Sequence, residues 1–375
     1  MKEKDLNIAI FSPSQSPYSE TFIQAHKKYL RGKVFYYFGS GESMQLEEFG
    51  LLASKTQRWW LKIISKVLNK PASYAWTKSF LKSLKKQHID VVLVEYGTHA
   101  HRLLEALKQS RIPFVVHFHG YDASVKEVVE RHNNYHEVFK YASKIVAVSR
   151  KMESMLVNIG CKREKIAHTS CGPNDYFFNI EPQFLKKQFL ALGRFVDKKA
   201  PYYTVLAFKE VLKKHSDAML IMAGDGVLLN SVVNLVKHYK LDDNIKFLGV
   251  VKPKEYRSLL QESLAFVQHS ITAENGDMEG TPVAIVEANL AGLPVISTYH
   301  AGIPDVVTHN KTGLLCEEHD VEMMSKYMLQ LIDDIDFAKQ LGQAGKKHIK
   351  QNFSMRHHID KLQEILITAS KKSII

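Results

Sequence analysis

Glu279 and Glu287 are the residues whose type and spacing point most directly to chemistry. They stand in the segment ENGDMEGTPVAIVEANLAGLPV, with seven residues between them. Thr281 suits the N-cap of a short helix, Pro282 its first position and Gly292 the residue after its end. One carboxylate therefore lies just before a helix and the other within it, about 12 Å away if the rise were helical throughout.

The start of this helix is expected to bind an anion. Unpaired backbone amides and the helix dipole both favour a phosphate group there. One glutamate would then bind the hydroxyls of a sugar and the other those of a ribose, with a diphosphate between them. The backbone that forms the anion site is that of Gly280, Thr281, Pro282 and Val283.

A pair of basic residues follows a strand-like run earlier in the chain. In LGRFVDKKAPY, Arg194 and Lys199 come after FLALG and before a helical pattern. Arginine offers a planar fork of donors and lysine a point charge, which together hold a diphosphate. Solvated cations at a strand end are the ordinary alternative. Gly224, in AGDGVLL, marks either a tight turn between strand and helix or a further backbone contact to the same ligand.

Alternating strands and helices are needed to position these residues. Short runs rich in β-branched and aromatic residues recur from NIAIF to PVISTY, and amphipathic patterns such as YTVLAFKEVLKKH separate many of them. This alternation predicts an α/β fold with parallel sheets that helices cover on both faces. Doubly wound sheets bind ligands at the carboxyl ends of their strands, so we expect a cleft between two Rossmann-like domains.

The chain is long enough for two such domains. Its 375 residues exceed the size at which one hydrophobic core usually stops growing. The strand pattern restarts at Phe189, after the polar stretch NIEPQFLKKQ. We therefore expect an N-terminal domain over residues 1–185 and a C-terminal domain over residues 186–354. Residues 355–375 fit a final helix with an apolar stripe.

The positive charge of the chain is concentrated in one stretch. The formal net charge is +12, and residues 51–90 hold nine basic residues, one acid and all three tryptophans. Within this stretch, RWWLKIISKVLNK has an apolar stripe at helical spacing and a second stripe of lysines. The apolar stripe is Trp60, Ile63, Ile64, Val67 and Leu68, and the second stripe is Lys62, Lys66 and Lys70.

This stretch has the composition of a helix that lies on an anionic membrane surface. An ordinary surface helix, whose apolar face packs on its own domain, is the alternative. Nucleic acid is not expected as a partner, because no recognised binding module accompanies the charge.

Composition excludes several classes of protein. Hydrophobic residues make up 45% of the chain and aromatic residues 10%, which excludes a disordered or collagen-like protein. The three cysteines match no zinc spacing and suit a reducing compartment. The apolar run at the N-terminus is too short for a signal peptide, and no window reaches the roughly 18–20 apolar residues of a spanning helix. We expect a cytoplasmic protein whose membrane contact is peripheral.

Around Glu279 and Glu287 the sequence resembles the retaining glycosyltransferases of family 4, which have the GT-B fold. The E-x7-E signature of that family corresponds to these two glutamates, and AGLPVIST, HAGIPDVV and NKTGLLCEEHD match its usual surroundings. The resemblance covers nearly the whole chain. With SPYSETFI it points to transferases that build capsule, colanic-acid-type or other bacterial surface polysaccharides.

The resemblance implies a role for each residue singled out above. Arg194 and Lys199 match the cations that hold the donor diphosphate. Glu279 would orient the donor sugar and Glu287 the ribose. His119, in HFHGYD, matches a histidine close to the donor sugar, with a structural histidine as the alternative.

Further residues follow from the resemblance through less specific motifs. Asp122 and Tyr121 lie in GYD, where an acceptor-side role and a loop-capping aspartate are both open. We expect His117 to face the opposite side of its strand from His119. The nucleotide base is expected to rest on the main chain of LGVVK, at Gly249, Val250 and Val251.

One loop departs from the family pattern. Many members have two glycines after the first strand, whereas this chain reads SPSQSPYSE. Ser19 would cap a helix that begins at Glu20, which leaves the contact of this loop with a phosphate open.

The resemblance implies that a sugar passes from a nucleotide-sugar donor to an acceptor hydroxyl with retention of configuration. Cations and amides would stabilise the charge on the leaving diphosphate. No metal or other cofactor is expected, and no aspartate cluster resembles a metal-binding motif. The C-terminal helix would return to the first domain, as it does in the family.

The expected donor is a UDP-sugar, and the expected acceptor is lipid-linked or a polysaccharide, at the inner face of the plasma membrane. Three alternatives stay open: a GDP-sugar (mannosyl-type) transferase, a nucleotide-sugar epimerase and a non-catalytic assembly subunit.

Overall fold

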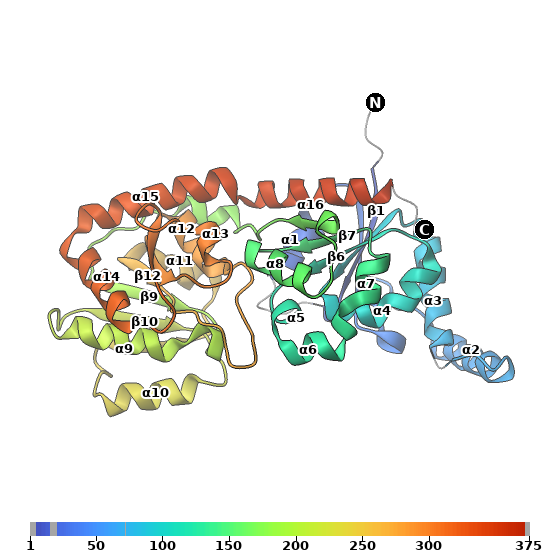
Figure 1. Ribbon diagram of the computed structural model, residues 1–375, viewed down its shortest axis with the longest axis horizontal. Helices are drawn as coiled ribbons and strands as arrows, with labels where there is room; N and C mark the ends of the chain where they lie inside the picture. Colours follow the sequence, from blue (N-terminus) through green and yellow to red (C-terminus); the bar gives the residue numbers. More distant parts are fainter. Residues whose placement is uncertain (1–4, 16–20, 72, 372–375) are drawn as a thin grey trace. The chain divides into compact units, whose positions relative to one another are not determined.

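The chain, described by a computed structural model over residues 5–15, 21–71 and 73–371, divides into two compact units (Figure 1). The first unit consists of Met1–Val148, Met152–Thr169 and Ile359–Ile375, and the second of Ser149–Lys151 and Ser170–His358. Each unit contains its own sheet. The predicted α/β class with two doubly wound sheets is confirmed.

Within the residues that the structure describes, the sheet of the first unit has eight strands in the order β4-β3-β2-β1-β5-β6-β7-β8. The strands are β1 (Asn7–Ser12), β2 (Lys33–Phe38), β3 (Gln45–Leu46), β4 (Gly50–Leu51), β5 (Val91–Glu95), β6 (Phe114–Phe118), β7 (Lys144–Ala147) and β8 (Ile166–His168). All pairs are parallel except those of β3 and β4 at one edge. Strands β5 and β6 are buried along their whole length, as in a sheet covered on both faces.

Helices connect these strands and close the unit. They are α1 (Thr21–Tyr29), α2 (Lys55–Val67), α3 (Tyr74–Lys86), α4 (Gly97–Ser110), α5 (Tyr121–Ser124), α6 (Lys126–Arg131), α7 (His136–Tyr141), α8 (Arg150–Asn158) and α16 (Met355–Ser370). Short 3-10 turns are η1 (Gly41–Ser43), η2 (Asn133–Tyr135) and η3 (Arg163–Lys165).

The sheet of the second unit has six parallel strands in the order β11-β10-β9-β12-β13-β14. They are β9 (Gln188–Leu192), β10 (Met219–Ala223), β11 (Ile245–Gly249), β12 (Ala265–Val267), β13 (Val295–Thr298) and β14 (Gly313–Cys316). The helices are α9 (Pro201–Leu212), α10 (Leu229–His238), α11 (Pro253–Glu262), α12 (Val283–Ala291), α13 (Ile303–Val306), α14 (Val321–Asp333) and α15 (Ile335–Asn352), with 3-10 turns η4 (Asp175–Asn179) and η5 (Asp197–Lys199).

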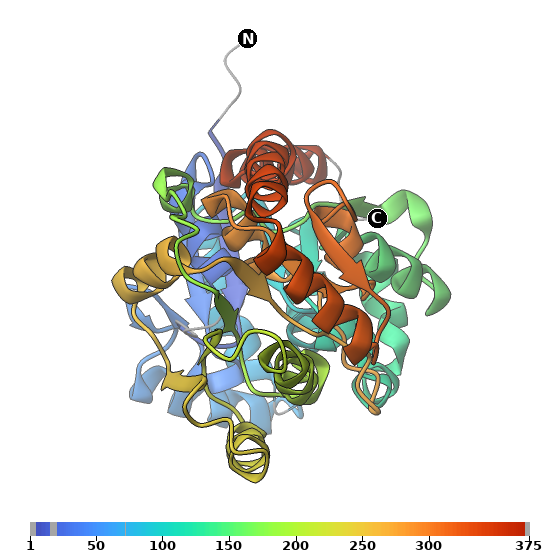
Figure 2. The same ribbon diagram turned by 90° about the vertical axis from the view of Figure 1, so that its left-hand side faces the viewer.

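Two apolar clusters form the core of the second unit, one on each face of its sheet. Helices α9, α10 and α14 bury their side chains in the first cluster, and α11, α12 and α13 in the second. Figure 2, which turns this unit toward the viewer, shows α9 and α10 on one side of the strands and α11 and α12 on the other.

The strand order reverses beside the first strand of each sheet. Strand β1 lies between β2 and β5, and β9 lies between β10 and β12. Connections leave such a point in opposite directions, which opens a crevice at the carboxyl ends of the strands. The residues that follow β5, β9 and β12 lie beside these two points, where doubly wound folds generally bind their ligands.

The boundary between the units lies before residue 170, earlier than the expected division at residue 185. Phe177 and Ile180 are buried in the core of the second unit with Tyr256 and Leu290. The segment after residue 170 therefore belongs to this unit because its apolar side chains complete that core, although its polar composition resembles a linker.

The C-terminal helix α16 enters the first unit at Ile359. Leu362 and Leu366 are buried, and Arg31 and Gln363 exchange two hydrogen bonds. The Arg31 N–H donates to Gln363 Oε1 at 2.9 Å, and Gln363 Nε2 donates back to the Arg31 carbonyl at 3.3 Å. These contacts tie the end of the chain to its beginning.

Candidate functional site

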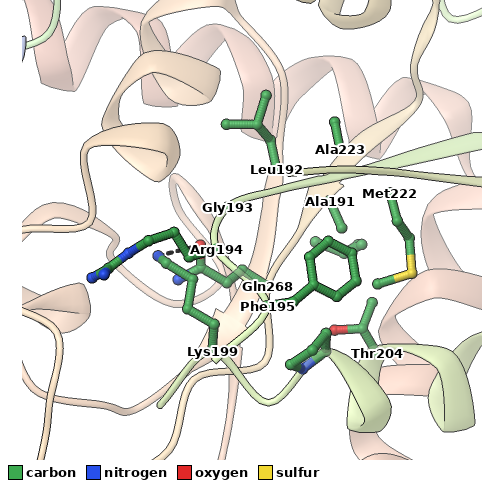
Figure 3. A pocket seen from close by; sticks show the side chains of 12 residues that line it. Ala191, Leu192, Gly193, Arg194, Phe195, Lys199, Thr204, Met222, Ala223 and Gln268 are labelled. Carbon is green, nitrogen blue, oxygen red and sulfur yellow. Dashed lines mark hydrogen bonds between the residues drawn. The ribbon is translucent and has the colours of Figure 1, made fainter. Parts of the chain in front are cut away.

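The predicted basic pair lies at the point where the second sheet reverses its order. Arg194 follows β9, Lys199 ends η5, and Gln268 follows the neighbouring strand β12. These residues line one pocket, in which Lys199 Nζ donates a hydrogen bond to Gln268 Oε1 at 3.1 Å (Figure 3). Lys199 Nζ also lies 3.2 Å from Glu279 Oε1. The structure thus brings Lys199 and the first glutamate of the signature together.

Lys199 and Glu279 form an ion pair in a largely buried place. Burial acts to raise the pKa of Glu279, but Lys199, Lys198 and His300 outweigh it and leave that pKa below its ordinary value. Burial lowers the pKa of Lys199, and Glu279 opposes this effect. The alignment is that of an ion pair and not of a good hydrogen bond, since Glu279 Oε1 has no hydrogen-bond partner among the described residues. That oxygen is itself buried, and the charge of Lys199 compensates it.

Arg194 is exposed at the rim of the same pocket. Figure 3 shows its side chain extending away from Phe195 and Met222, which form the apolar side. Within the described parts of the chain, its guanidinium takes part in no hydrogen bond or ion pair. An unneutralised guanidinium next to Lys199 favours an anionic ligand.

Three residues that sequence reasoning missed hold the loop around Glu279. Lys198 Nζ donates to Asp277 Oδ1 at 2.9 Å. The Glu279 N–H donates to His300 Nε2 at 3.1 Å, and His300 Nδ1 donates to Glu318 Oε1 at 2.6 Å. His300 and Glu318 stand in HAGIPDVV and NKTGLLCEEHD, so the strings that surround the signature contained this signal.

The helix after Glu279 begins one position later than expected. Its first residue is Val283 and its N-cap is Pro282, while the Thr281 hydroxyl accepts a hydrogen bond from the Cys171 N–H at 3.4 Å. The prediction of Thr281 as N-cap is wrong because this distant partner takes its side chain. Gly292 ends α12 with a φ of 88°, as predicted.

Glu287 lies on α12 in a setting unlike that of Glu279. Burial raises its pKa to about 8, so the carboxyl group is protonated near neutral pH. Burial, and to a smaller extent Glu287, raises the pKa of Tyr256, whose buried hydroxyl has no hydrogen-bond partner among the described residues.

Glycines let two loops approach at the same edge of the sheet. A Cβ atom on Gly224 would lie 2.0 Å from the Gly193 carbonyl oxygen, and the Gly224 N–H donates to the Gly249 carbonyl at 2.7 Å. The tight-turn interpretation of Gly224 thus has a physical basis. Beside it, Val250 is 57% exposed, whereas Val251 is buried in the core.

In the first unit, His119 follows β6 and contacts Glu95, the last residue of β5. His119 Nε2 lies 2.7 Å from Glu95 Oε2, and His26 Nδ1 of α1 lies 2.7 Å from Glu95 Oε1. Glu95 was not predictable from the sequence, in which it is only one acid at the end of an apolar strand. His26, Glu95 and His117 offer atoms within 4.8 Å of one another, the spacing of a metal site, but the two 2.7 Å contacts are hydrogen bonds.

The expectation that His117 faces away from His119 is wrong. Side chains two positions apart on a strand lie on the same face. The two rings accordingly have centroids 4.2 Å apart, and His117 Nδ1 lies 3.5 Å from Glu95 Oε2.

Asp122 is buried and its oxygens accept three backbone hydrogen bonds. The donors are the N–H groups of Gly97 at 2.8 Å and of His119 and Gly120 at 3.0 Å. This is the loop-capping arrangement. Tyr121 is 39% exposed and its hydroxyl lies 3.2 Å from Thr98 Oγ1. Ser19 lies outside the described residues.

Two family models match consecutive parts of the chain. Residues 36–175 match "Glycosyltransferase Family 4", and residues 176–348 match "Glycosyl transferases group 1". The chain belongs to this glycosyltransferase family. Together the two models cover residues 36–348.

Curated relatives of this glycosyltransferase support the same family. The amylovoran biosynthesis glycosyltransferase AmsK of Erwinia amylovora is 29% identical over 74% of this chain and 70% of its own length. The putative colanic acid biosynthesis glycosyltransferase WcaL of Escherichia coli K12 is 27% identical over 64% of this chain and 60% of its own. A GDP-mannose-dependent phosphatidylinositol monomannoside mannosyltransferase of Corynebacterium glutamicum is 29% identical over 46% and 45%.

Solved structures place the glycosyltransferase in the GT-B fold. HepE of Anabaena, in complex with UDP and glucose, has a TM-score of 0.76 and 15% sequence identity, with 96% of this chain and 99% of that chain covered. At this identity the likeness shows the fold alone. No helix among the described residues is both long enough and apolar enough to cross a membrane.

Proposed function

We propose that this glycosyltransferase moves a sugar from a nucleotide-diphosphate sugar to a hydroxyl group of a lipid-linked or polysaccharide acceptor, with retention, in the synthesis of a bacterial surface polysaccharide. The names of AmsK and WcaL support the polysaccharide product. The resemblance of the signature to retaining enzymes supports the stereochemistry.

The observation that carries this proposal is the pair of cations beside Glu279 at the reversal of the second sheet. As the bond from the sugar to the diphosphate breaks, positive charge grows on the sugar and negative charge on the phosphate. The proposal assigns the stabilisation of this phosphate to Lys199 and to Arg194, which has no ion pair among the described residues. The acceptor oxygen forms the new bond on the face that the phosphate leaves, and its proton passes to that phosphate. The step needs no enzymic nucleophile.

A UDP-sugar is the proposed donor, and a GDP-sugar is the alternative. HepE binds UDP and glucose, whereas the Corynebacterium relative depends on GDP-mannose. Arg194 and Lys199 would bind the diphosphate of either donor equally well, because UDP- and GDP-sugars differ in the base and the sugar. Epimerases and non-catalytic subunits would lack transfer to an acceptor.

A panel of UDP- and GDP-sugars, read by thermal shift and donor hydrolysis, tests the proposal. We expect a UDP-sugar to stabilise the protein and to be hydrolysed slowly, also in EDTA. Arg194→Ala and Lys199→Ala should abolish the shift, while Lys237→Ala, which removes an exposed cation of α10, should keep it. If no donor binds or reacts, the proposal fails.

We also propose that α2 binds an anionic membrane surface, where a lipid-linked acceptor would be found. Helix α2 begins with a capping box between Ser54 and Gln57, and its only buried residue is Ser65. Helix α2 packs beside α3 (Figure 1). The apolar stripe is largely uncovered, with exposed fractions of 58% for Trp60 and 77% for Val67.

The exposure of these side chains supports the membrane proposal over the packing alternative. Apolar side chains that stay in water cost free energy, and lysines beside them favour anionic lipid headgroups. Lys62 pairs with Glu42, whereas Lys66 and Lys70 are exposed. The charge and the uncovered apolar face together fit a membrane surface better than a neutral protein partner.

Binding to vesicles tests the membrane proposal. Trp60→Ala with Lys62→Glu and Lys66→Glu should weaken binding to phosphatidylglycerol vesicles by more than about tenfold, since each basic residue near such a surface contributes about 1 kcal/mol. The matched control changes Leu185→Ala, Lys237→Glu and Lys240→Glu, which are exposed in the second unit. Equal binding of both variants would show that α2 is not a membrane face.

A further inference from the structure

Glu95 is a fully buried carboxylate surrounded by three histidine rings. It ends β5 beside the reversal of the first sheet, and its exposed fraction is 0%. A buried carboxylate costs several kcal/mol unless it is paired and hydrogen-bonded. Here His26 Nδ1 contacts Oε1 and His119 Nε2 contacts Oε2, both at 2.7 Å. Both oxygens are thus engaged by imidazole groups.

The protonation of this cluster follows from its geometry. Burial acts to raise the pKa of Glu95, but His26, His117 and His119 outweigh it and hold that pKa well below its ordinary value. An ionised carboxylate only accepts hydrogen bonds, so His119 Nε2 must carry a proton. Burial lowers the pKa of His119, which favours its neutral form with no proton on Nδ1.

Other contacts fix the ring and the backbone of His119. Phe22 stacks on the ring with centroids 4.3 Å apart, and Tyr96 packs against it at 4.8 Å. The His119 N–H donates to Asp122. Among the described residues, no hydrogen bond reaches His119 Nδ1.

We propose that Glu95 is a positioning residue that holds His119 as the Nε2–H tautomer, so that Nδ1 offers a lone pair to a hydroxyl group of the donor sugar. The proposal rests on the assignment of His119 to the donor sugar under the proposed function. A hydroxyl can donate to such a nitrogen, whereas an Nδ1–H tautomer would compete with it as a donor. The carboxylate thereby makes this nitrogen a hydrogen-bond acceptor for a sugar hydroxyl, although it does not touch the sugar.

Nitrogen NMR of the ligand-free enzyme, labelled at histidine, tests the tautomer directly. His119→Gln identifies the signals of His119. We expect a protonated Nε2 and an unprotonated Nδ1 in the unaltered protein. The opposite tautomer overturns the proposal, as does a zinc ion found bound in equimolar amount by mass spectrometry. These readouts need no transfer activity, so a wrong tautomer is distinguishable from a failure of the donor panel.

Kinetics of Glu95→Gln complete the test. The amide can donate as well as accept, so the tautomer should become mixed and kcat should fall roughly 10–100-fold, with a smaller change in KM. Glu105→Gln, which alters a 70% exposed carboxylate on α4, is the matched control and should leave both unchanged. The proposal is overturned if His119 keeps a single tautomer in Glu95→Gln and kcat is unaltered. Where this variant does not fold, the NMR result for the unaltered protein decides.

Discussion

At the residue scale, the two glutamates of the signature have opposite electrostatic surroundings. Glu279 lies beside Lys199 and stays ionised, while burial raises the pKa of Glu287 to about 8. An ionised carboxylate only accepts hydrogen bonds, whereas a protonated one both donates and accepts. Similar pairs with separated pKa values divide two roles between two carboxyl groups.

Glu279→Ala should reduce transfer by about a hundredfold or more and leave nucleotide affinity close to that of the unaltered enzyme. Glu279 is proposed to orient the sugar, and misplacement of a reacting group costs this much. Steady-state kinetics and UDP titration measure the two effects. Glu274→Ala, an exposed glutamate of the same loop, serves as control. Full activity of Glu279→Ala would refute the role.

Glu287 should make the stability of the ligand-free protein fall as the pH rises from about 4.5 to about 8. The folded state keeps a proton on Glu287 over this range, while the unfolded chain releases it, so higher pH favours unfolding. Urea midpoints at pH 5.5 and 8 measure the effect. Glu287→Gln should flatten the dependence, and Glu274→Gln should not. The same slope in Glu287→Gln and the unaltered protein would contradict the assignment.

At the element scale, the site depends on two loops whose backbones touch. The loops after β9 and β10 meet at Gly193 and Gly224, and a Cβ on Gly224 would lie 2.0 Å from the Gly193 carbonyl oxygen. Gly302 has the same relation to Gly280, also at 2.0 Å. The loops that carry Arg194 and Glu279 are thus held by backbone contact that only glycine permits.

Gly224→Ala should lower the free energy of unfolding by more than about 2 kcal/mol and weaken donor binding, because the loops must separate. Gly249→Ala is the matched control. Its φ is also positive, at 64°, but no atom lies within 4 Å of the added Cβ, so a cost of roughly 1 kcal/mol is expected. Urea unfolding of both variants measures the difference. Equal costs would mean that the contact does not constrain the loops.

The end of an element is predictable from sequence when the residue that causes it lies in the same segment. Gly292 ends α12 because its backbone φ is positive, which the chain signals by its residue type. Thr281 failed as an N-cap because its partner, Cys171, is distant in sequence. The stripe on α2 showed which side chains are apolar, but not that the protein leaves them uncovered. Glu95 was missed because its partners, His26 of α1 and His119 after β6, are not related to it by sequence spacing.

At the scale of the whole molecule, the fold class was predictable and the limits of the units were not. Alternating strands and helices determine two doubly wound sheets. The boundary near residue 170 depends on tertiary packing, since Phe177 and Ile180 complete the core of the second unit. Polar composition indicates which residues of a segment face solvent. It does not indicate where the core of a unit ends.

Leu362→Ala should lower the free energy of unfolding by about 2–5 kcal/mol, because the side chain is fully buried on α16 in the first unit. Lys361→Ala, its exposed neighbour, should change it by less than about 0.5 kcal/mol. Thermal and urea unfolding measure both. A Leu362→Ala protein as stable as the unaltered chain would show that α16 contributes little to the first unit.

The return of α16 to the first unit has a consequence for how the protein is made. A nascent chain leaves the ribosome from its N-terminus, and in most multidomain proteins the first domain therefore folds first. Here residues 170–358 are all translated before Ile359 can join the first unit. The hydrogen bond between Arg31 and Gln363 therefore forms only after that point. The second unit is complete while the first is still short of its last helix. If translation paused near residue 358, chaperones would meet a first unit that lacks its last helix and a second unit that is complete.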